Sequence, residues 1–387
     1  MSLPSRRTVM SLGCVLGAAA LALTPAGPAS AAPYVFENVA DSTVSGFDPF
    51  AFGCASINNR GQVAFRAGRF APDGFNTIPG IYRANTDGSL SVIADNRRVY
   101  DFIGFNPSMN DFGVVSFAAL IDGGAQDNFE AILVGAGSNR VGVVADTRGE
   151  FRFFGFDTSI NNRREVAFKA ELDSTGQGLF SGRRGGPITT HYLNSTSPFG
   201  GTDSRPAIND GGNVAFEETV NFDEGIFVGQ DGQFRTVVAP AEDVALDEPV
   251  LNNANLTAFE RSFTDPATDL FVTEIVTSTA GGPVTTVVDT RGPFGEFGFR
   301  PPALNNTGDV AFLGTLDDFA TTAVFVGPDP VADRVIAVGD TLDGEVITGL
   351  RFCEEGLNDS GQLTFIADFQ DPTTFEQRTA VYRATPG

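Results

Sequence analysis

The sequence predicts an all-β protein built from repeated units, and three observations support this class. A nine-residue string that contains an Asn-Asn or Asn-Asp pair occurs seven times at nearly constant spacing. Each copy ends in an apolar segment with a phenylalanine, in a pattern typical of a β-strand. The 387 residues also include 45 glycines and 22 prolines, which favours many short strands over long helices.

The repeat accounts for almost the whole chain after the N-terminal segment. The string runs from Ile57 to Phe65 in the first copy, and the interval between successive copies is 43 to 53 residues. Seven units of about fifty residues predict a repeat architecture, in which each unit is one supersecondary element. The first Asn of the pair is Asn58, Asn110, Asn161, Asn209, Asn252, Asn305 and Asn358.

Each unit reads as four short antiparallel strands. The first ends at the Asn pair, the second carries the phenylalanine, and the third and fourth are short and apolar, as at 80–83 and 141–146. The residue before the phenylalanine is small in every copy, as in Ala64-Phe65. Successive side chains of a strand point to opposite faces, so a bulky and a small face are both expected to be buried. Stacked sheets of this kind predict a seven-bladed β-propeller. The alternative is a β-solenoid, which would need fewer residues in each repeat.

The two ends of the chain predict how the ring closes. Residues 36–41 resemble a fourth strand, yet they precede the first repeat, while the last repeat ends after its third strand at 380–383. We therefore expect the N-terminal strand to complete the last blade. Residues 32–387 are predicted to form a single propeller domain.

The N-terminus predicts an export signal. Arg6 and Arg7 precede the apolar run 11–23, and Ala29-Ser30-Ala31 is an A-x-A-type cleavage site. We expect residues 1–31 to be a twin-arginine-like signal peptide cleaved near Ala31, with the general secretory route as the alternative. A lipid anchor at Cys14 is disfavoured because the apolar stretch before it is too short. No later segment has the roughly 20 apolar residues of a membrane span, so we expect a secreted protein.

The charge balance restricts the partners. The chain carries 25 basic and 48 acidic residues, a net charge of −23, and Lys169 is its only lysine. Such an acidic protein is not expected to bind nucleic acid. The predicted partner is an unidentified extracellular protein or glycan, and we expect a monomer.

The Asn-containing string is interpreted as a structural turn. Asn and Asp side chains accept hydrogen bonds from turn amides, and glycine supplies a left-handed residue. Arg164 and Asn255 stand where the other copies have glycine. Calcium ligation is the alternative, but no copy has the spacing of a calcium loop. The predicted turn residues are Asn58, Gly61, Asn110, Gly113, Asn161, Asn209, Gly212, Asn252, Asn305, Gly308, Asn358 and Gly361.

These residues carry a family resemblance. The repeat resembles that of exported bacterial tandem-repeat proteins with the N-x-x-G-x-x-A-F signature, some of which have C-terminal anchors (choice-of-anchor type). The resemblance implies neither an established activity nor a cofactor, and no catalytic residue is carried over. This sequence departs from that pattern in showing no C-terminal sorting segment, so retention at the cell surface and free release both stay open.

The inventory of reactive residues favours a binding role. His191 is the only histidine, predicted at the surface of a fourth strand, and no nucleophile or phosphate-loop motif is present. We predict a secreted, non-catalytic binding or scaffold propeller. The alternative is a secreted carbohydrate-active hydrolase or lyase that uses carboxylates at the mouth of the channel.

A ligand site is predicted at the channel mouth opposite the Asn turns. Counting back four residues from the first Asn of a copy gives a set of polar and charged side chains on the innermost strands. Asp157, Glu248 and Glu354 are candidate calcium ligands there; no other cofactor is predicted. The alternative is a solvated mouth whose charges neutralise one another. The set consists of Asn106, Asp157, Arg205, Glu248 and Glu354.

Two further features concern the rim and the cysteines. The aromatic segments 148–156 and 291–300 are interpreted as blade-to-blade packing, with a ligand-binding rim as the alternative. Cys54 and Cys353 are the only cysteines after the signal, high on the innermost strands of the first and last blades. We predict a disulfide between them, since export permits one; the alternative is two buried thiols.

Overall fold

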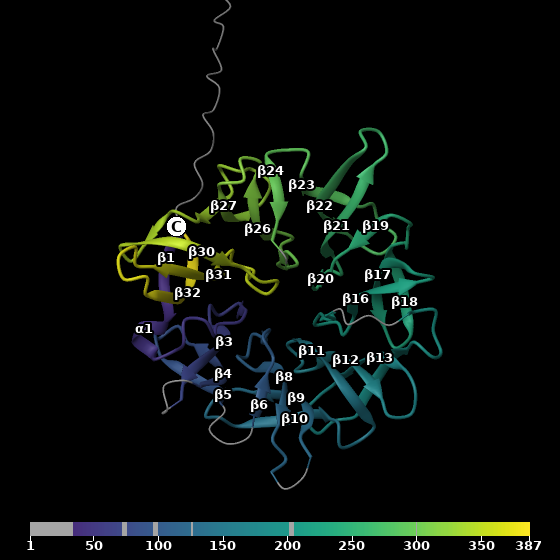
Figure 1. Cartoon of the computed structure of the whole chain (residues 1–387). Helices are drawn as coiled ribbons and strands as arrows, with labels where there is room; N and C mark the ends of the chain where they lie inside the picture. The colour runs from purple at the N-terminus through teal and green to yellow at the C-terminus, as the bar shows by residue number, and fades with distance from the viewer. Residues whose placement is uncertain (1–33, 72–75, 96–99, 125–126, 201–204, 299) are drawn as a thin grey trace, which may run out of the picture.

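The seven repeats form seven sheets arranged in a ring around a central channel (Figure 1). The structure is a computed structural model and describes residues 34–71, 76–95, 100–124, 127–200, 205–298 and 300–387. This arrangement confirms the predicted seven-bladed β-propeller. The predicted signal, residues 1–31, lies outside the described residues. One short helix, α1 (Ser42–Ser45), follows the first strand, and no described helix is long and apolar enough to cross a membrane.

The first four blades follow one another along the chain, each with its innermost strand first. Blade 1 consists of β2 (Ala55–Ile57), β3 (Val63–Phe70), β4 (Thr77–Ala84) and β5 (Leu90–Asp95). Blade 2 consists of β6 (Tyr100–Ile103), β7 (Ser108–Met109), β8 (Val115–Ile121), β9 (Phe129–Gly135) and β10 (Val141–Asp146). Blade 3 consists of β11 (Phe151–Ile160), β12 (Val166–Leu172), β13 (Gln177–Gly182) and β14 (Ile188–Leu193). Blade 4 consists of β15 (Ala207–Ile208), β16 (Val214–Val220), β17 (Asp223–Gln230) and β18 (Gln233–Val238).

The remaining blades complete the ring. Blade 5 consists of β19 (Val244–Leu246), β20 (Val250–Leu251), β21 (Thr257–Asp265), β22 (Leu270–Ser278) and β23 (Thr285–Asp289). Blade 6 consists of β24 (Phe294–Phe297), β25 (Ala303–Leu304), β26 (Val310–Leu316), β27 (Thr322–Val326) and β28 (Arg334–Ala337). Blade 7 consists of β29 (Thr341–Leu342), β30 (Glu345–Arg351), β31 (Leu363–Gln370), β32 (Gln377–Pro386) and β1 (Tyr34–Asp41).

The innermost strand is divided in three blades. The pairs β6/β7, β19/β20 and β24/β25 each bond to one neighbouring strand. Pro107, Pro249 and Pro302 stand directly before the second member of each pair. Proline has no amide hydrogen for the ladder and is tolerated only at a strand's start or at an irregularity. Blade 3 has no proline at this place, and β11 runs unbroken for ten residues.

The N-terminal strand closes the ring as predicted. β1 pairs antiparallel with β32, in a register that runs from Tyr34 opposite Pro386 to Asp41 opposite Ala380. Asp41 Oδ2 lies 2.6 Å from a guanidinium nitrogen of Arg378. The outermost strand of the last blade therefore comes from the opposite end of the chain.

The blades pack large face against small face, as the repeat pattern predicts. Ala64 of β3 and Phe117 of β8 belong to one buried cluster, and Ala167 packs in the same way with Phe216. The phenylalanines of the second strands are almost completely buried. Burying a side chain of this size contributes roughly 1.5–3 kcal/mol, so these phenylalanines stabilise the stacking of the blades.

Candidate functional site

One mouth of the channel is closed by the seven predicted Asn turns. Within each turn the first Asn accepts, through its side-chain oxygen, the backbone amide four residues later, as Asn161 does from Glu165 at 3.0 Å. Its amide nitrogen donates to the carbonyl of the next blade's first Asn, as from Asn161 to Asn209 at 3.0 Å. The seventh bond, from Asn358 to Asn58, closes the circle. The same two bonds occur in all seven turns.

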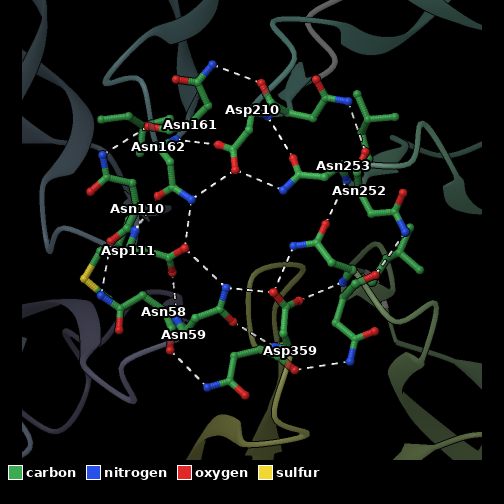
Figure 2. Close-up of a pocket in the computed structure, with 18 of the residues that line it drawn as sticks. Asn58, Asn59, Asn110, Asp111, Asn161, Asn162, Asp210, Asn252, Asn253 and Asp359 are labelled. Atoms are coloured by element: carbon green, nitrogen blue, oxygen red, sulfur yellow. Dashed lines mark hydrogen bonds between the residues drawn. The ribbon is translucent and has the colours of Figure 1, made fainter.

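The second residue of each pair forms a further ring (Figure 2). Each backbone amide donates to the side-chain oxygen of the next blade's residue, at 2.7–2.9 Å. Asn and Asp alternate around the ring, and the Oδ2 atoms of Asp111, Asp210 and Asp359 each accept from two Asn amides. Seven is odd, so one neighbouring pair must be alike. That pair is Asn253 and Asn306, which avoids placing two carboxylates side by side.

These two rings of hydrogen bonds connect neighbouring blades and have a structural role. The space they enclose is a cavity of about 160 Å³. Its polar groups bond mainly to one another, and the glycine of five turns has a positive φ, as do Arg164 at 60° and Asn255 at 62°. The predicted structural turn is thus also the inter-blade connection.

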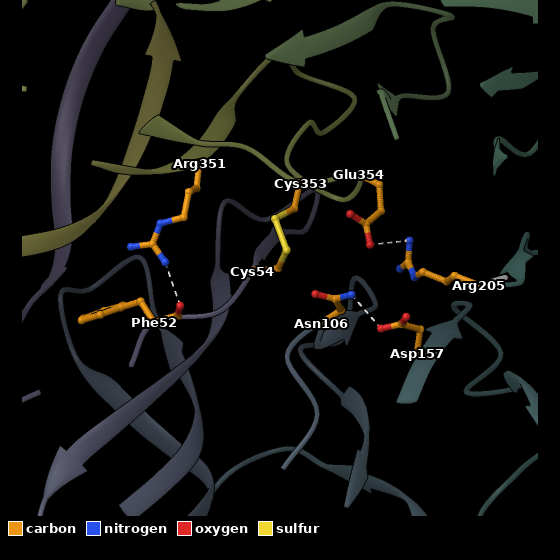
Figure 3. Close-up of a disulfide and its surroundings, with 8 residues drawn as sticks. All are labelled: Phe52, Cys54, Asn106, Asp157, Arg205, Arg351, Cys353 and Glu354. Carbon is orange, nitrogen blue, oxygen red and sulfur yellow. Dashed lines mark hydrogen bonds and ion pairs between the residues drawn. A yellow bond between two sulfur atoms is a disulfide. The ribbon is translucent and has the colours of Figure 1, made fainter. Parts of the chain in front are cut away.

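Toward the opposite mouth, the structure brings the five predicted site residues together, and Figure 3 shows four of them, Asn106, Asp157, Arg205 and Glu354. Arg205 lies at their centre: its guanidinium is 3.0 Å from Glu354, and its backbone amide donates to Glu248 at 2.8 Å. Asn106 donates to Asp157 at 2.6 Å. The positions four residues before the Asn pairs therefore share one part of the channel as predicted. Strand parity is not the reason, because Asp157 in β11 is the one member of the five that lies in a strand.

Sequence reasoning missed Glu355, which connects opposite sides of the channel. Its carboxylate accepts from Arg205, from Ser108 Oγ at 2.7 Å and from the Met109 amide at 3.2 Å. The alternation of a regular strand would have pointed Glu355 away from Glu354. Here the chain turns instead, with Gly356 donating to the Cys353 carbonyl at 2.8 Å, and both carboxylates reach Arg205. The sequence feature that could have indicated this contact is that Glu355 directly follows Glu354.

This group contains one cation, the guanidinium of Arg205, surrounded by the four carboxyl groups of Asp157, Glu248, Glu354 and Glu355. Burial raises the pKa of Glu248 to about 7, although the Arg205 amide partly offsets this. Burial likewise raises the pKa of Asp157 and of Glu355. Burial alone would lower the pKa of Arg205, but the surrounding carboxylates, Glu354 foremost, more than offset this and raise it. Arg205 is therefore a permanent charge, whereas part of the carboxyl set holds protons near neutral pH.

Two buried oxygens of the group have no hydrogen-bond partner in the described part of the chain, Glu354 Oε2 and Asn106 Oδ1. Both are ligand types that calcium accepts. A calcium ion at Asp157, Glu248 and Glu354 would compete with the Arg205 guanidinium, which already holds Glu354. Calcium binding stays a prediction.

The disulfide is present as predicted. The sulfur atoms of Cys54 and Cys353 are bonded, and their Cα atoms are 5.9 Å apart. The predicted position was wrong in one respect: neither cysteine lies in a strand, because Cys54 precedes β2 and Cys353 follows β30. The irregular backbone at both places brings the two side chains together despite their one-residue offset in the repeat.

His191 also differs from its predicted place. It lies in β14, but it is buried instead of being at the surface. Its Nε2 is 2.9 Å from Ser181 Oγ, and its Nδ1 accepts from the Asp231 amide at 3.2 Å. Burial lowers its pKa. The side chain fills the blade 3–blade 4 interface and does not reach the channel.

A cavity of about 470 Å³ lies beside the charged group, with the disulfide in its wall. Phe52, Phe105, Phe297 and Phe352 line it. Two arginines, Arg300 and Arg351, supply its positive charge, and Glu296 lies among them. In the predicted aromatic segments, Phe151, Phe154 and Phe294 are buried in blades, as the packing interpretation predicts. The end of segment 291–300 lines this cavity, and a ligand-binding role for it stays a prediction.

Several solved structures share the architecture. The β-propeller domain of the trilobed protease from Pyrococcus furiosus aligns with a TM-score of 0.52 at 11% identity, covering 86% of this chain and 94% of that one. The acylaminoacyl peptidase of Pyrococcus horikoshii gives 0.51 at 11%, covering 85% and 52%. Prolyl oligopeptidase B from Galerina marginata gives 0.51 at 10%, covering 82% and 47%. At these identities the likeness shows the fold alone, and the chain spans about half the length of the two peptidases.

The trilobed-protease propeller is described as having an open velcro topology. Here, by contrast, β1 pairs with β32 and closes the last blade. None of the curated proteins compared with the chain matches it. Residues 57–246 and 243–384, which together span nearly all of the repeats, match one protein-family model. The chain therefore belongs to the Family of unknown function (DUF7453).

Proposed function

We propose that this protein is a secreted, non-catalytic binding propeller whose ligand occupies the cavity beside the disulfide. The observation that supports this proposal most directly is the cavity itself. Its volume of about 470 Å³ falls within the range of small-molecule sites. Four phenylalanines provide an apolar lining, and a few charged groups provide orientation. The partner is an extracellular small molecule, glycan or protein segment that presents such a group.

The lining suggests the chemistry of the ligand. Aromatic faces favour an apolar or ring-shaped body, and guanidinium groups favour a carboxylate, sulfate or phosphate. Arg351 is already held by the Phe52 carbonyl at 2.7 Å and by Asp368 at 2.9 Å. Arg300 is exposed, and no described carboxylate lies within 4 Å of it, so it is the arginine available to a ligand. We therefore infer a ligand with an apolar body and one anionic group.

The hydrolase or lyase alternative has less support. Glycoside cleavage needs two carboxyls that face the substrate, one as acid and one as base or nucleophile. In the channel, Glu354 and Glu355 are held by Arg205, and Asp157 is held by Asn106. Carboxyls engaged in this way favour a structural crosslink over proton transfer.

The absence of tryptophan from the sequence offers a direct test. Phe105 is 46% exposed on the cavity wall, so Phe105→Trp introduces a single indole fluorophore there. As the probe we would use 1-anilinonaphthalene-8-sulfonate, which has an apolar body and one anionic group. We expect saturable one-to-one binding with energy transfer from the introduced tryptophan, weakened at least tenfold by Arg300→Ala.

The matched control is Phe222→Trp, since Phe222 is fully exposed at a blade 4 hairpin. Its fluorophore should show no transfer at the same probe concentration. Equal transfer in both variants, or binding that is unaffected by Arg300→Ala, would contradict the proposed cavity.

A further inference from the structure

A further cavity, of about 510 Å³, lies between blades 2 and 3 and is lined by five arginines; we call it the arginine groove. It is formed on the face of the propeller that carries the Asn turns, because Arg163 and Arg164 follow Asn162 directly. The other arginines come from two hairpins that reach the same face, β9–β10 and β13–β14. Val114 and Val134 are apolar residues of its lining. The five are Arg140, Arg163, Arg164, Arg183 and Arg184.

This concentration of positive charge stands out in so acidic a chain. The sequence has 25 basic residues against 48 acidic ones, yet five arginines converge here, and all are exposed. Glu165 is the one described carboxylate paired with them, at 3.8 Å from Arg163 and 3.7 Å from Arg183. Within the described residues, no carboxylate lies within 4 Å of the other three. The arginine groove therefore carries an uncompensated positive charge on an acidic protein.

At this interface the third strand, β9, has no arginine that reaches the turn of the next blade, unlike the third strands of blades 1 and 7. In blade 1, Arg83 stands opposite Ala64 and donates to the Gly113 carbonyl of the next blade. In blade 7, Arg383 reaches Gly61 in the same way. The corresponding residue of blade 2 is Val134, opposite Ser116. Valine places no guanidinium across this interface, and five arginines from the turn and the two hairpins line the space.

Arg164 is held in a strained conformation at the edge of this groove. Its φ is 60°, at the turn position where five other copies have glycine and one has asparagine. A left-handed residue with a Cβ costs roughly 1–2 kcal/mol. Its guanidinium lies 6.0 Å from the Phe112 ring, and that of Arg60 lies 5.5 Å from the same ring. Strain of this kind tends to persist where the residue serves a function.

We propose that the arginine groove binds a compact anion carrying at least two oxyanion groups. Phosphate, sulfate and carboxylate share this chemistry, and guanidinium groups bind their oxygens in bidentate pairs. Arginines from both blades surround the space, so a ligand with two separated anionic groups contacts more of them than a single oxyanion does. The acidic surface elsewhere opposes a long polyanion, and the volume is that of a small-molecule site. The arginine groove is a separate site from the cavity beside the disulfide, and this proposal does not depend on a ligand in that cavity.

The test uses the whole chain with pyrophosphate, citrate and orthophosphate as probes, and binding is measured by calorimetry at low salt. We expect one pyrophosphate or citrate per chain, with orthophosphate at least tenfold weaker. A preference for pyrophosphate assigns a phosphorylated ligand, and a preference for citrate assigns a polycarboxylate. Binding of neither pyrophosphate nor citrate, or equal binding of all three probes, overturns the proposal.

Arg164→Gly separates a functional from a structural role. Glycine relieves the left-handed strain, so this variant should melt higher than the parent while it binds pyrophosphate at least tenfold more weakly. Arg184→Ala should weaken binding to a similar extent. The control is Arg235→Ala, which removes the same charge from an exposed position on β18 and should change affinity less than twofold. Parent-like binding by Arg164→Gly, or an equal loss in the control, shows nonspecific attraction and overturns the assignment.

Discussion

At the scale of single residues, the first Asn of each repeat does two tasks that no other side chain combines at this length. Its oxygen accepts amides of its own turn, and its nitrogen donates to the next blade. Aspartate would keep the first task and lose the second. The local turn follows from the Asn-x-x-Gly spacing, but the inter-blade bond depends on a residue about fifty positions away.

The first prediction tests this division. Asn161→Asp replaces the donor facing the Asn209 carbonyl with a carboxylate oxygen, so a buried acceptor loses its partner and meets a negative charge. We expect the unfolding free energy to fall by about 1–3 kcal/mol, measured by chemical denaturation. Asn221→Asp, at an exposed hairpin, makes the same chemical change and should alter stability by less than about 0.5 kcal/mol. Equal losses would show that the inter-blade bond contributes nothing.

A second prediction concerns Glu260 in β21. Burial, and secondarily the nearby Asp247 carboxylate, raises the pKa of Glu260 to about 7. The folded state therefore binds this proton more tightly than the unfolded chain. Its contribution to stability is fully present below about pH 4.5 and is lost as the pH rises toward 7.

Glu260→Gln removes this titration. We expect the loss of stability between about pH 5 and pH 7.5 to be smaller in the variant, by at most about 3 kcal/mol. Denaturation curves at both pH values measure it, with Glu150→Gln at an exposed turn as the control. An unchanged pH dependence would show that Glu260 titrates alike in both states.

At the scale of elements, proline sets where the innermost strands break and β1 sets where the ring closes. Pro107, Pro249 and Pro302 have no amide hydrogen to donate to the neighbouring strand before β7, β20 and β25. The innermost strands of these blades are therefore irregular near the charged residues around Arg205. β1 covers the outer edge of β32 from Ala380 to Pro386. An uncovered strand edge is a template for pairing with another chain.

The third prediction follows from β1. A chain lacking residues 32–44 loses this strand and the Asp41–Arg378 pair, so the edge of β32 is exposed. We expect a melting temperature lower by about 5 °C or more, since 1 kcal/mol corresponds to roughly 2–4 °C in larger domains, together with self-association. A chain beginning at Ala32 is the control, and a peptide of residues 34–45 added in trans should restore part of the loss. A monomeric truncation that melts like the control would show that β1 is dispensable.

At the scale of the whole molecule, blades 7 and 1 are joined by contacts of several kinds. β1 pairs with β32, Asn358 donates to Asn58, and the disulfide links residues 299 positions apart. A disulfide across so long a loop stabilises mainly by restricting the unfolded chain, by about 3–5 kcal/mol. The strand pairing, the Asn358–Asn58 hydrogen bond and the disulfide therefore all hold the ring closed between blade 7 and blade 1.

The fourth prediction is that two of these closures are coupled. Cys54→Ala with Cys353→Ala should lower stability by about 3–5 kcal/mol. The disulfide removal and the loss of β1 together should cost more than the sum of their separate effects, because either closure keeps the ring shut while the other is absent. A thermodynamic cycle of the four proteins measures the coupling. Strict additivity would show that the two act on separate equilibria.

Much of the fold could be predicted because the sequence repeats its local pattern seven times. The small-then-Phe dipeptide predicts two buried faces, and the chain ends predict the exchange that closes the ring. The predicted site residues also assemble around Arg205, since each stands at the same place in its repeat, although only Asp157 of the five lies in a strand. The family match adds no activity, and the ligand stays a proposal.

Local pattern thus determined the sheets, their number and their stacking, because hydrophobic periodicity and turn chemistry act within each repeat. The tertiary structure alone decided the contacts that depend on neighbouring blades or on irregular backbone. Glu355 reaches Arg205 because the chain turns at Gly356, and the arginine groove forms where one turn and two hairpins of blades 2 and 3 meet. Such contacts depend on distances between repeats, and no single repeat specifies those distances.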